Sequence, residues 1–361
     1  MRRTAALIIG GGPAGAAAAI MLARGGIATE LFERTQAAHD VVCGGFLSWD
    51  SIGALDRLGV DAFALGARPI TRLRLVSGTH QVEVDLPKRA AGLSRGKLDE
   101  ALLLASGAAG TTVTRGKSVR AADAATCSVR LDDGEEIAAD ALFLATGKHE
   151  LRGLGRPTTW TGRGAVGLRT ALPASNASET LDSVIELHLF DGGYAGLLLQ
   201  EDGRTNLCVS VAKDRFSRAG SAAALIAELA TEAPLLGARV SKAGAAAWQT
   251  IAGVPYGWRA EETPYGLFRL GDQGAVISSL AGDGVAIALT SGMEAASAFL
   301  RDGPAAAGAF QATLARKARL PLKIADLLRY SVERRSLRPA LMHLATIRGL
   351  VPLAARLTRI A

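Results

Sequence analysis

The feature that most constrains the fold of this chain is a glycine pattern near its start, Gly10-x-Gly12-x-x-Gly15. The pattern follows an apolar stretch at residues 5–9 and opens a run of small residues at 13–24, which predicts a buried parallel strand joined to a helix. At such a join the first glycine permits a tight turn, the second lets the backbone approach a pyrophosphate, and the third lets helix and strand pack closely. The sequence therefore predicts a dinucleotide-binding βαβ unit.

An acidic residue stands where this unit needs one. The second expected strand, residues 28–32, is followed by Glu33 and Arg34. A carboxylate there can accept hydrogen bonds from the adenosine ribose and repels a 2′-phosphate, which favours FAD or NAD over NADP. The alternative is a glycine-rich turn with a surface glutamate. A similar pattern at residues 162–167 predicts only the entry to a strand, because the segment runs on toward Pro173 and leaves little room for a helix.

A second glycine cluster near the end of the chain distinguishes FAD from NAD. It contains Gly271 and Asp272 after an apolar strand, and then Gly282-Asp283-Gly284 before a helical pattern. FAD is extended, and its ribityl chain and flavin must be held far from the adenine. We expect Asp272 to accept a hydrogen bond from the ribityl chain, and the 282–284 turn to direct N–H groups at the flavin. The alternative is an ordinary turn with capping aspartates. The two clusters together predict one non-covalently bound FAD.

Two further motifs give the chain a family resemblance. Arg95-x-x-x-Asp99 at a predicted helix start and Cys43-Gly44-Gly45 accompany the glycine clusters, and together they resemble the geranylgeranyl reductase family over about residues 4–300. That family lies within the wider p-hydroxybenzoate-hydroxylase-like flavoproteins. The resemblance implies Arg95 near the FAD phosphates or ribityl chain and Cys43 near the substrate face of the flavin. The candidate cofactor-binding residues are Gly10, Gly12, Pro13, Ala14, Gly15, Glu33, Arg34, Cys43, Gly44, Arg95, Gly147, Gly271, Asp272, Gly282, Asp283, Gly284 and Val285.

The sequence departs from these relatives around the reaction centre. Ser279 stands where the reductases often have proline, and Tyr194 remains from their substrate-cavity motif without the tryptophan and proline that follow it. Thr146 replaces an acid of the hydroxylases, which favours reductase over hydroxylase chemistry. Cys43 and Tyr194 are the candidate catalytic residues, with His149 a further candidate proton donor. The alternatives are a small buried thiol for Cys43 and sheet packing for Tyr194.

The order of strand and helix patterns predicts an α/β protein with a discontinuous nucleotide domain. Alternating apolar residues between 162 and 249 predict an antiparallel sheet inserted into that domain. The region after Pro304 is predicted to be helical, with interruptions at Pro321, Pro339 and Pro352. The expected parts are a Rossmann-type FAD-binding domain at 1–70, 90–160 and 264–303, a β-sheet substrate domain at 71–89 and 161–263, and a basic helical tail at 304–361.

The positive charge of the chain is concentrated in this tail. The net charge is +7, but residues 316–361 carry eleven Lys and Arg against two acids, and the rest of the chain sums to −2. No nucleic-acid motif accompanies these bases, so an anionic membrane surface is the expected partner. The alternative is a set of closing helices with a solvated basic face.

Cysteine spacing and the N-terminal segment indicate the compartment. Cys43, Cys127 and Cys208 lie far apart, which excludes a zinc ribbon or a dithiol centre by spacing, suits a reducing cytoplasm and predicts no metal. Arg2 and Arg3 before an uncharged stretch allow a signal peptide or membrane span, but Gly10–Pro13 interrupt the apolar run after five residues. We expect a cytoplasmic protein that contacts the inner face of the membrane.

The favoured function is an FAD-dependent oxidoreductase that reduces, or in reverse dehydrogenates, a double bond in a hydrophobic isoprenoid- or polyketide-like molecule. The electron donor would be NAD(P)H or a ferredoxin. One alternative is an FAD-dependent monooxygenase that hydroxylates an aromatic or polyketide substrate. Another is a membrane-peripheral FAD-binding protein without turnover. The sequence leaves the substrate, the proton donor and the oligomeric state open.

Overall fold

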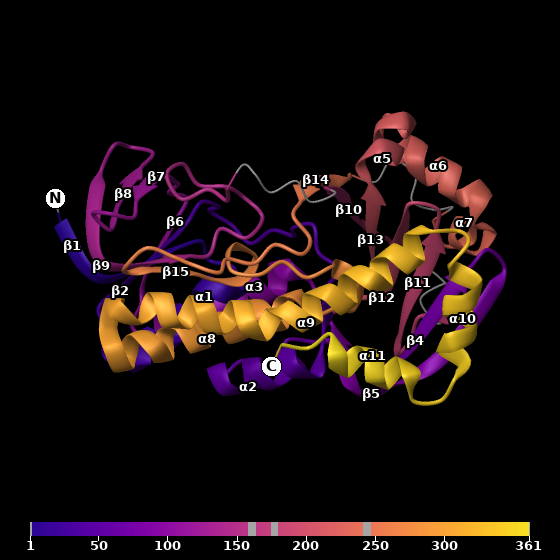
Figure 1. Cartoon of the computed structure of the whole chain (residues 1–361), viewed down its shortest axis with the longest axis horizontal. Helices are drawn as coiled ribbons and strands as arrows, with labels where there is room; N and C mark the ends of the chain where they lie inside the picture. Colours follow the sequence, from indigo (N-terminus) through magenta and orange to yellow (C-terminus); the bar gives the residue numbers. More distant parts are fainter. Residues whose placement is uncertain (1, 158–163, 175–179, 241–246, 361) are drawn as a thin grey trace.

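Two β-sheets stand at opposite ends of the long axis of the molecule, and long helices join them (Figure 1). The structure is a computed structural model that describes residues 2–157, 164–174, 180–240 and 247–360. The predicted α/β class, with a Rossmann-type sheet, a second largely antiparallel sheet and C-terminal helices, is confirmed.

The first sheet has the strand order β6-β2-β1-β9-β8-β7, with β15 paired to β9. β1 lies at its centre, parallel to β2 on one side and to β9 on the other. Its strands are β1 (Arg2–Ile9), β2 (Thr29–Glu33), β6 (Thr112–Arg115), β7 (Val119–Asp123), β8 (Ser128–Leu131), β9 (Glu136–Leu144) and β15 (Leu267–Arg269). β9 is one continuous strand that pairs with β8 near its start and with β1 along its length.

Both faces of this sheet are covered, which explains the continuous apolar runs of its central strands. Ile8 and Phe143 face a helical layer made by α1 (Pro13–Arg24), α8 (Gly284–Asp302) and the start of α9 (Ala307–Glu333). On the opposite face the β7–β8 hairpin and the loop after β9 complete the core. The helix α3 (Arg95–Ala108) packs beside α1.

Close contact between α1 and α8 sets the relative position of the two glycine clusters. α1 is rich in alanine, and Ala16–Ala19 are all fully buried. A side chain at Gly292 would lie 2.2 Å from the carbonyl oxygen of Ala14, so only glycine lets α8 approach α1 this closely. Because the first cluster opens α1 and the second opens α8, this contact brings both ligand loops to one side of the sheet.

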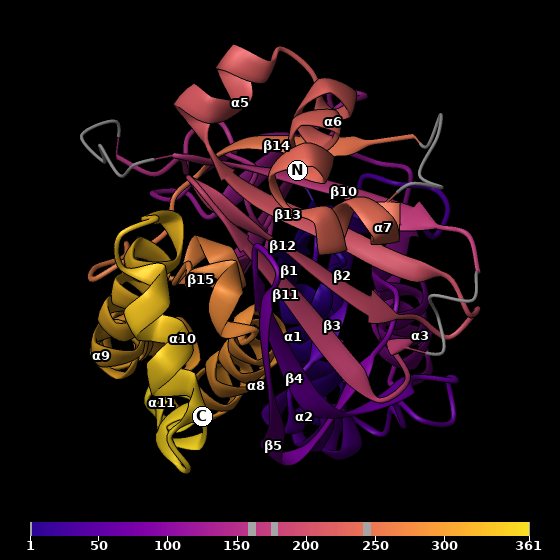
Figure 2. The same ribbon diagram turned by 90° about the vertical axis from the view of Figure 1, so that its right-hand side faces the viewer.

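The second sheet has the strand order β14-β10-β13-β12-β11-β4-β5-β3. All its neighbours pair antiparallel except β11 and β4, which are parallel. Its strands are β3 (Phe46–Leu47), β4 (Arg68–Ser77), β5 (His80–Gly92), β10 (Ala165–Leu172), β11 (Val184–Phe190), β12 (Gly193–Leu199), β13 (Thr205–Ala212) and β14 (Gln249–Val254). The helices α5 (Lys213–Ala219), α6 (Ala222–Glu232) and α7 (Pro234–Val240) cover one face of this sheet (Figure 2). β10 confirms the predicted strand after the second glycine pattern, although Gly162 itself lies outside the described residues.

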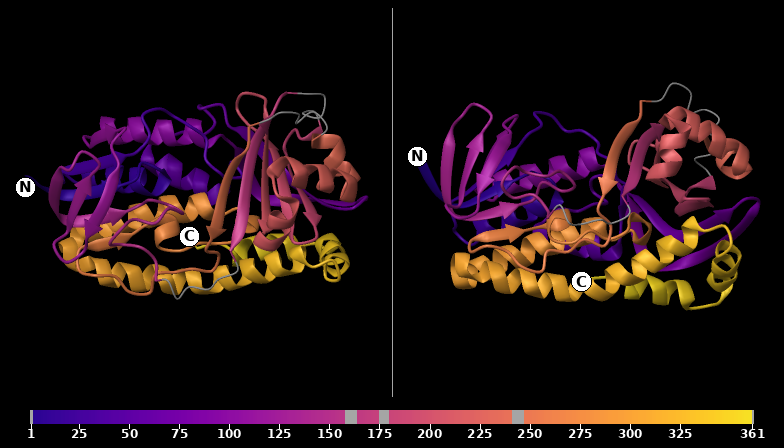
Figure 3. Two further views of the ribbon diagram at one scale, coloured as in Figure 1. Left: turned by 90° about the horizontal axis from the view of Figure 1, so that it is seen from above. Right: turned by 45° about the horizontal axis from the view of Figure 1, so that its top comes forward.

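The helix α9 runs from the first sheet to the second, as two further views show (Figure 3). It continues through Pro321, so the predicted interruption there is wrong. Burial of Leu314, Ala318, Leu322 and Ala325 against the neighbouring helices and loops holds the helix together despite the missing backbone donor. The shorter α10 (Arg338–Thr346) and α11 (Leu350–Leu357) follow.

The two short helices after α9 return along the second sheet. α10 packs on β4 and β5, and α11 packs on β5 and α9. Pro339 lies in the first turn of α10, where it removes no helical hydrogen bond, and Pro352 lies inside α11. Among the described residues no single helix is long and apolar enough to cross a membrane, and the pair α10–α11 meets that test only when both are joined across a 109° bend.

Candidate functional site

The first glycine cluster forms a tight loop between β1 and α1. Gly10 has φ +106°, and a side chain there would lie 2.5 Å from the carbonyl oxygen of Ala145. A side chain at Gly15 would lie 2.0 Å from the carbonyl oxygen of Gly10. Gly12 caps α1, Pro13 occupies its first turn, and the N–H groups of this turn have no partner within the helix. The loop therefore presents free N–H groups and the positive end of a helix dipole.

Glu33 holds this loop from the end of β2. One of its oxygens accepts a hydrogen bond from the Gly11 N–H at 2.8 Å, and the other accepts two from Thr35, at 2.9 and 2.7 Å. Burial opposes ionisation, but these hydrogen bonds outweigh it, so the pKa of Glu33 lies below its ordinary value. The neighbouring Arg34 contacts Nε2 of His149 at 2.9 Å, and burial together with Arg34 lowers the pKa of His149.

Arg95 faces the open side of the loop. The nearest atom to a side-chain carbon added at Gly12 is Nη2 of Arg95, at 3.5 Å. Asp99 fixes the guanidinium with two hydrogen bonds of 2.8 and 2.7 Å. Burial alone would lower the pKa of Arg95, but Asp99 reverses the shift and keeps the guanidinium charged. Free helix N–H groups, a glycine with room beside it and a fixed cation are what a pyrophosphate requires, so these residues fit FAD.

A second group of polar residues lies between the two glycine clusters. Gly271 has φ +52° and donates its N–H to Ser291 at 2.8 Å, and Asp272 follows it in a short 3-10 helix, Gly271–Gln273. Nζ of Lys148 lies 2.8 Å from an Asp272 carboxylate oxygen. Burial would lower the pKa of Lys148, but Asp272 raises it, so the pair is ionic. The expected ribityl acceptor is thus already paired to a lysine that the sequence did not single out.

Gly147, at the end of β9, is tied into the same region. Its carbonyl oxygen accepts hydrogen bonds from Arg156 at 3.0 Å and from Gln273 at 2.9 Å. Thr146, which replaces the acid of the hydroxylases, donates to the carbonyl oxygen of His149 at 2.8 Å. These bonds stabilise the short loop after β9 and hold it against the 3-10 helix that contains Asp272.

The second glycine cluster opens α8 as predicted. Ser279–Ala281 form a 3-10 turn, Gly282 follows with φ +66°, and Gly284 begins the helix. Ser279 and Gly284 are exposed, and a side chain at Gly284 would meet no atom within 4 Å. Val285, also a predicted site residue, instead points into the core and is 8% exposed. The exposed face of this turn, at a helix N-terminus, fits the negative edge of a reduced flavin.

Asp283 turns away from this exposed face. Its carboxylate is fully buried and accepts hydrogen bonds from Ser48 at 3.2 Å and Arg359 at 2.5 Å. The Arg359 guanidinium also lies 4.4 Å from the centre of the Trp49 ring and 3.7 Å from Asp50. Burial raises the pKa of Asp283 to about 6, against the opposing effect of Arg359. The ion pair between Arg359 and Asp283 thus holds the turn at residues 279–284, called the flavin turn below, from the side opposite its exposed face.

The Cys43-Gly44-Gly45 segment crosses from the FAD-binding region to the second sheet. Asn206 donates from Nδ2 to the carbonyl oxygens of Cys43 at 3.0 Å and Gly44 at 2.7 Å. The buried Arg169 orients Asn206 through a 2.8 Å hydrogen bond and forms an ion pair of 2.6 Å with Asp40. The segment is therefore held by strands β10 and β13 of the second sheet.

One spot on the second sheet is more open than its surroundings. Gly196 in β12 and Cys208 in β13 are partly exposed within strands that are otherwise almost entirely buried. They are directly paired, and Tyr194 and Asn206 lie two residues away on the same face. Since Asn206 binds the Cys43 segment, this face looks toward the flavin turn. Burial raises the pKa of Cys208 to about 12, so it is a neutral thiol.

A chain of hydroxyl groups joins this face to the flavin turn. The Tyr194 hydroxyl donates to Oγ of Ser279 at 2.6 Å, and the Tyr256 hydroxyl contacts the same oxygen at 2.6 Å. Tyr256 also lies 3.4 Å from Oγ of Ser210. Burial raises the pKa of Tyr194 well above its ordinary value, so its proton is retained at neutral pH. Ser279 is the exposed member at the centre of this chain.

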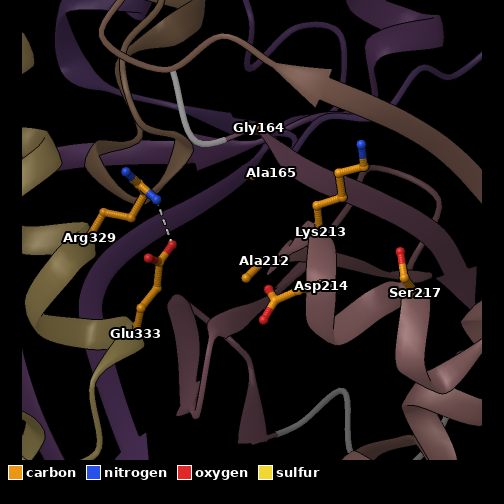
Figure 4. Close-up of a pocket in the computed structure, with 8 residues that line it drawn as sticks. All are labelled: Gly164, Ala165, Ala212, Lys213, Asp214, Ser217, Arg329 and Glu333. Atoms are coloured by element: carbon orange, nitrogen blue, oxygen red, sulfur yellow. Dashed lines mark hydrogen bonds and ion pairs between the residues drawn. The ribbon is translucent and has the colours of Figure 1, made fainter. Parts of the chain in front are cut away.

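A pocket of about 570 Å³ lies between α9 and α5 (Figure 4). None of the predicted site residues lines it. Arg329 and Glu333 of α9 form an ion pair of 2.7 Å on one side, and Lys213 and Asp214 of α5 lie on the other. The Arg329 guanidinium, which lines this pocket, lies 5.6 Å from the centre of the Tyr256 ring.

Sequence reasoning missed several residues that the structure brings to the site. Each acts through a partner distant in the chain, and no local pattern marks it. They are Ser48, Trp49, Lys148, Arg156, Arg169, Asn206, Tyr256 and Arg359. Ser279 was visible only as a departure from the family pattern.

Comparison with known proteins agrees with this geometry. Residues 3–152 match a family described as the FAD binding domain. No curated protein matches the chain. The match spans the phosphate loop, Glu33, the Cys43 segment, Arg95 and Gly147, and FAD is confirmed as the cofactor.

Solved structures with different activities share the fold. A geranylgeranyl bacteriochlorophyll reductase-like protein from Thermoplasma acidophilum has a TM-score of 0.76 at 17% identity, covering 100% of this chain and 94% of its own. The flavin-dependent brominase Bmp2 has a TM-score of 0.74 at 16% identity, with 98% and 97% covered. A probable FAD-dependent monooxygenase from Pseudomonas aeruginosa has a TM-score of 0.71 at 17% identity, with 95% and 100% covered.

At these identities the likeness concerns the fold alone. The reductase resemblance inferred from motifs is therefore one of several distant similarities, and the structural matches do not distinguish a reductase from a brominase or a monooxygenase. The chain contains an FAD-binding domain and shares its overall fold with these flavin-dependent proteins.

Proposed function

We propose that this protein is an FAD-dependent oxidoreductase that reduces a carbon–carbon double bond in a hydrophobic small molecule. The observation that carries the proposal is the hydroxyl chain centred on Ser279, whose exposed Oγ lies in the flavin turn and contacts two tyrosine hydroxyls at 2.6 Å. Adding two hydrogens to a double bond requires a hydride for one carbon and a proton for the other. Reduced FAD supplies the hydride when bound.

The residues of the chain supply the proton in this scheme. Ser279 donates the proton from its exposed hydroxyl, and the hydrogen bond that Tyr194 donates to its Oγ stabilises the charge left on that oxygen. Tyr256 returns one proton to Ser279 and is itself reprotonated from solvent by way of Ser210. Burial raises the pKa of Tyr194, so this side chain serves as a fixed hydrogen-bond donor to Ser279 and keeps its own proton. Among the described residues Cys43 forms no hydrogen bond with Tyr194, Tyr256 or Ser279, and we assign its segment to positioning the flavin face.

The substrate would lie on the open spot of the second sheet. Gly196 and Cys208 provide a surface without charge, beside the buried apolar cluster that contains Leu187, Leu189 and Tyr194. A site with this lining favours a hydrophobic molecule and excludes water from the reacting bond. The electron donor, NAD(P)H or a ferredoxin, would act on the flavin in a separate step.

The test uses the holoprotein reduced without oxygen and mixed with candidate unsaturated lipids in deuterated water. The proposal expects flavin reoxidation and a saturated product with solvent deuterium on both carbons, because the N5–H of a reduced flavin also exchanges with deuterated water. Ser279→Ala should slow product formation about 100-fold, the lower end of what a general acid contributes. Tyr265→Phe is the matched control, because this tyrosine is 68% exposed and lies outside the hydroxyl chain.

Other outcomes would overturn the reductase assignment. Incorporation of an atom from labelled dioxygen into the product would establish a monooxygenase instead. A flavin that neither NAD(P)H, a ferredoxin nor dithionite can reduce would indicate a binding protein without turnover. A Ser279→Ala variant as fast as the parent protein would remove the hydroxyl chain from the mechanism.

A further inference from the structure

We propose that the outer face of helices α9, α10 and α11 docks onto an anionic membrane surface. The proposal rests on the exposed side chains of these helices and is independent of the reaction proposed above. It starts from the distribution of exposed apolar residues. Twelve large hydrophobic side chains of the described residues are exposed, and eight of them belong to α9–α11 and the turns between them. These are Leu320, Leu327, Tyr330, Leu337, Leu344, Ile347, Leu353 and Leu357.

α9 carries two different apolar faces. One includes Leu314, Leu322 and Val332 and is buried against the rest of the molecule. The other is exposed and recurs every three or four residues, which places its members on one side of the helix. Its members are Arg316, Leu320, Lys323, Leu327, Tyr330 and Arg334. Leu327 is 64% exposed and Leu320 is 57% exposed, so a fold that already buries one face leaves a second one in solvent.

Basic residues alternate with the apolar ones on this face. The two acids of the region, Asp326 and Glu333, are both paired with Arg329. Arg319 and Lys323 are exposed and form no ion pair with any described residue. The surface therefore presents uncompensated positive charge between exposed leucines.

The same pattern continues past the end of α9. The Arg334 guanidinium lies 4.2 Å from the centre of the Tyr330 ring, a cation–aromatic pair suited to a water–lipid interface. In α11, Arg356 is exposed between Leu353 and Leu357. The three helices lie together along one flank of the molecule (Figure 2).

Charge complementarity selects the partner. Exposed leucines beside unpaired bases match the acyl boundary and the phosphates of an anionic bilayer. A second copy of this chain would bring the same positive charge against itself, which opposes association through this face. α10 and α11 are too short to span a bilayer singly, so the contact is expected to lie at the interface.

The test is co-sedimentation of the FAD-loaded protein with phosphatidylcholine vesicles, with and without phosphatidylglycerol. The proposal expects binding only to the anionic vesicles, and release at high salt because the charges are screened. One basic side chain at an anionic surface contributes about five-fold in binding. The double variant Arg319→Glu/Lys323→Glu should therefore bind at least about 25-fold more weakly. The control is Arg120→Glu/Arg130→Glu, which makes the same change in net charge on β7 and β8, at the far end of the molecule.

The apolar contribution has its own matched pair. Leu327→Ser should weaken binding about tenfold, whereas Leu104→Ser on α3, at 66% exposure, should not change it. All variants are checked for bound FAD and for unchanged circular dichroism. Equal loss in the two charge variants, equal binding to neutral vesicles or no binding at all would overturn the proposal. A dimer that dissociates in Leu327→Ser would assign this face to a second copy and would also overturn it.

Discussion

Gly12→Ala separates what the fold needs from what the cofactor needs. The backbone at Gly12 is extended, with φ −71° and ψ −178°, a conformation that any residue adopts. The added methyl group would meet only Arg95, at 3.5 Å, which is ordinary van der Waals contact. Alanine is a poorer helix cap than glycine by roughly 0.5–1 kcal/mol, and a gain of about 0.4–1 kcal/mol from the stiffer unfolded chain offsets this. We expect the apoprotein to melt within about 3 °C of the parent.

FAD binding should respond very differently to the same change. The methyl group would occupy the space between the loop and the guanidinium, where the pyrophosphate has to approach. Loss of one charge-assisted hydrogen bond costs about 1.5–3 kcal/mol, or roughly 10- to 150-fold in affinity. The assay is a titration of apoprotein with FAD, followed by the quenching of flavin fluorescence, beside a thermal melt without FAD.

Two control variants accompany this measurement. Gly15→Ala would place a methyl group 2.0 Å from the carbonyl oxygen of Gly10, so it should lower the melting temperature of the apoprotein sharply. Gly107→Ala lies on α3, where the added carbon meets nothing within 4 Å, and should leave FAD affinity unchanged. The reasoning is refuted if Gly12→Ala binds FAD as tightly as the parent. It is equally refuted if Gly12→Ala destabilises the apoprotein as much as Gly15→Ala does.

Three further predictions concern residues around the cofactor. Glu33→Ala should weaken FAD binding about tenfold or more in the same titration, because the acceptor that holds the Gly11 N–H is lost; unchanged affinity would contradict this role. Because the folded-state pKa of Asp283 is raised to about 6, its contribution to stability is present below about pH 4 and is lost as the pH rises through about 6. Asp283→Asn should flatten this dependence in denaturant unfolding, and Arg359→Ala should destabilise the protein more at pH 8 than at pH 5. Gly292→Ala should lower the melting temperature of the apoprotein and of the holoprotein alike, because the clash with α1 is present in both.

The parts of the molecule that the sequence predicted well are those whose physical cause is local. The strand, glycine loop and helix at residues 2–24 are encoded within one contiguous segment, and α1 occupies Pro13–Arg24 as expected. The 282–284 turn likewise carries its own backbone requirement, since Gly282 has a positive φ. FAD followed from these two loops and is confirmed by the match over residues 3–152.

The parts that the sequence did not reveal depend on pairs that are far apart in the chain. Arg359 and Asp283 are separated by 76 positions, and Asn206 and Cys43 by 163. No sequence motif predicts which residue each of them pairs with, because a single arginine or asparagine is compatible with many surface positions. Pro321 shows the converse case, in which a local signal is present but the fold does not follow it. Its local preference to end a helix is overruled by burial along α9, which the sequence pattern alone does not quantify.

The glycine loops predict only that FAD is bound. The residues that differ from the reductase pattern therefore say most about the reaction. Proline at position 279 could not join a hydroxyl chain, whereas Ser279 contacts Tyr194 and Tyr256 at once. Gly196 stands where the family motif has tryptophan, and it is one of the partly exposed positions on an otherwise buried strand. Both changes face the same side of the flavin turn, one adding a hydroxyl and the other removing a large side chain. The chemistry specific to this protein is therefore expected on the second sheet rather than in the FAD-binding loops.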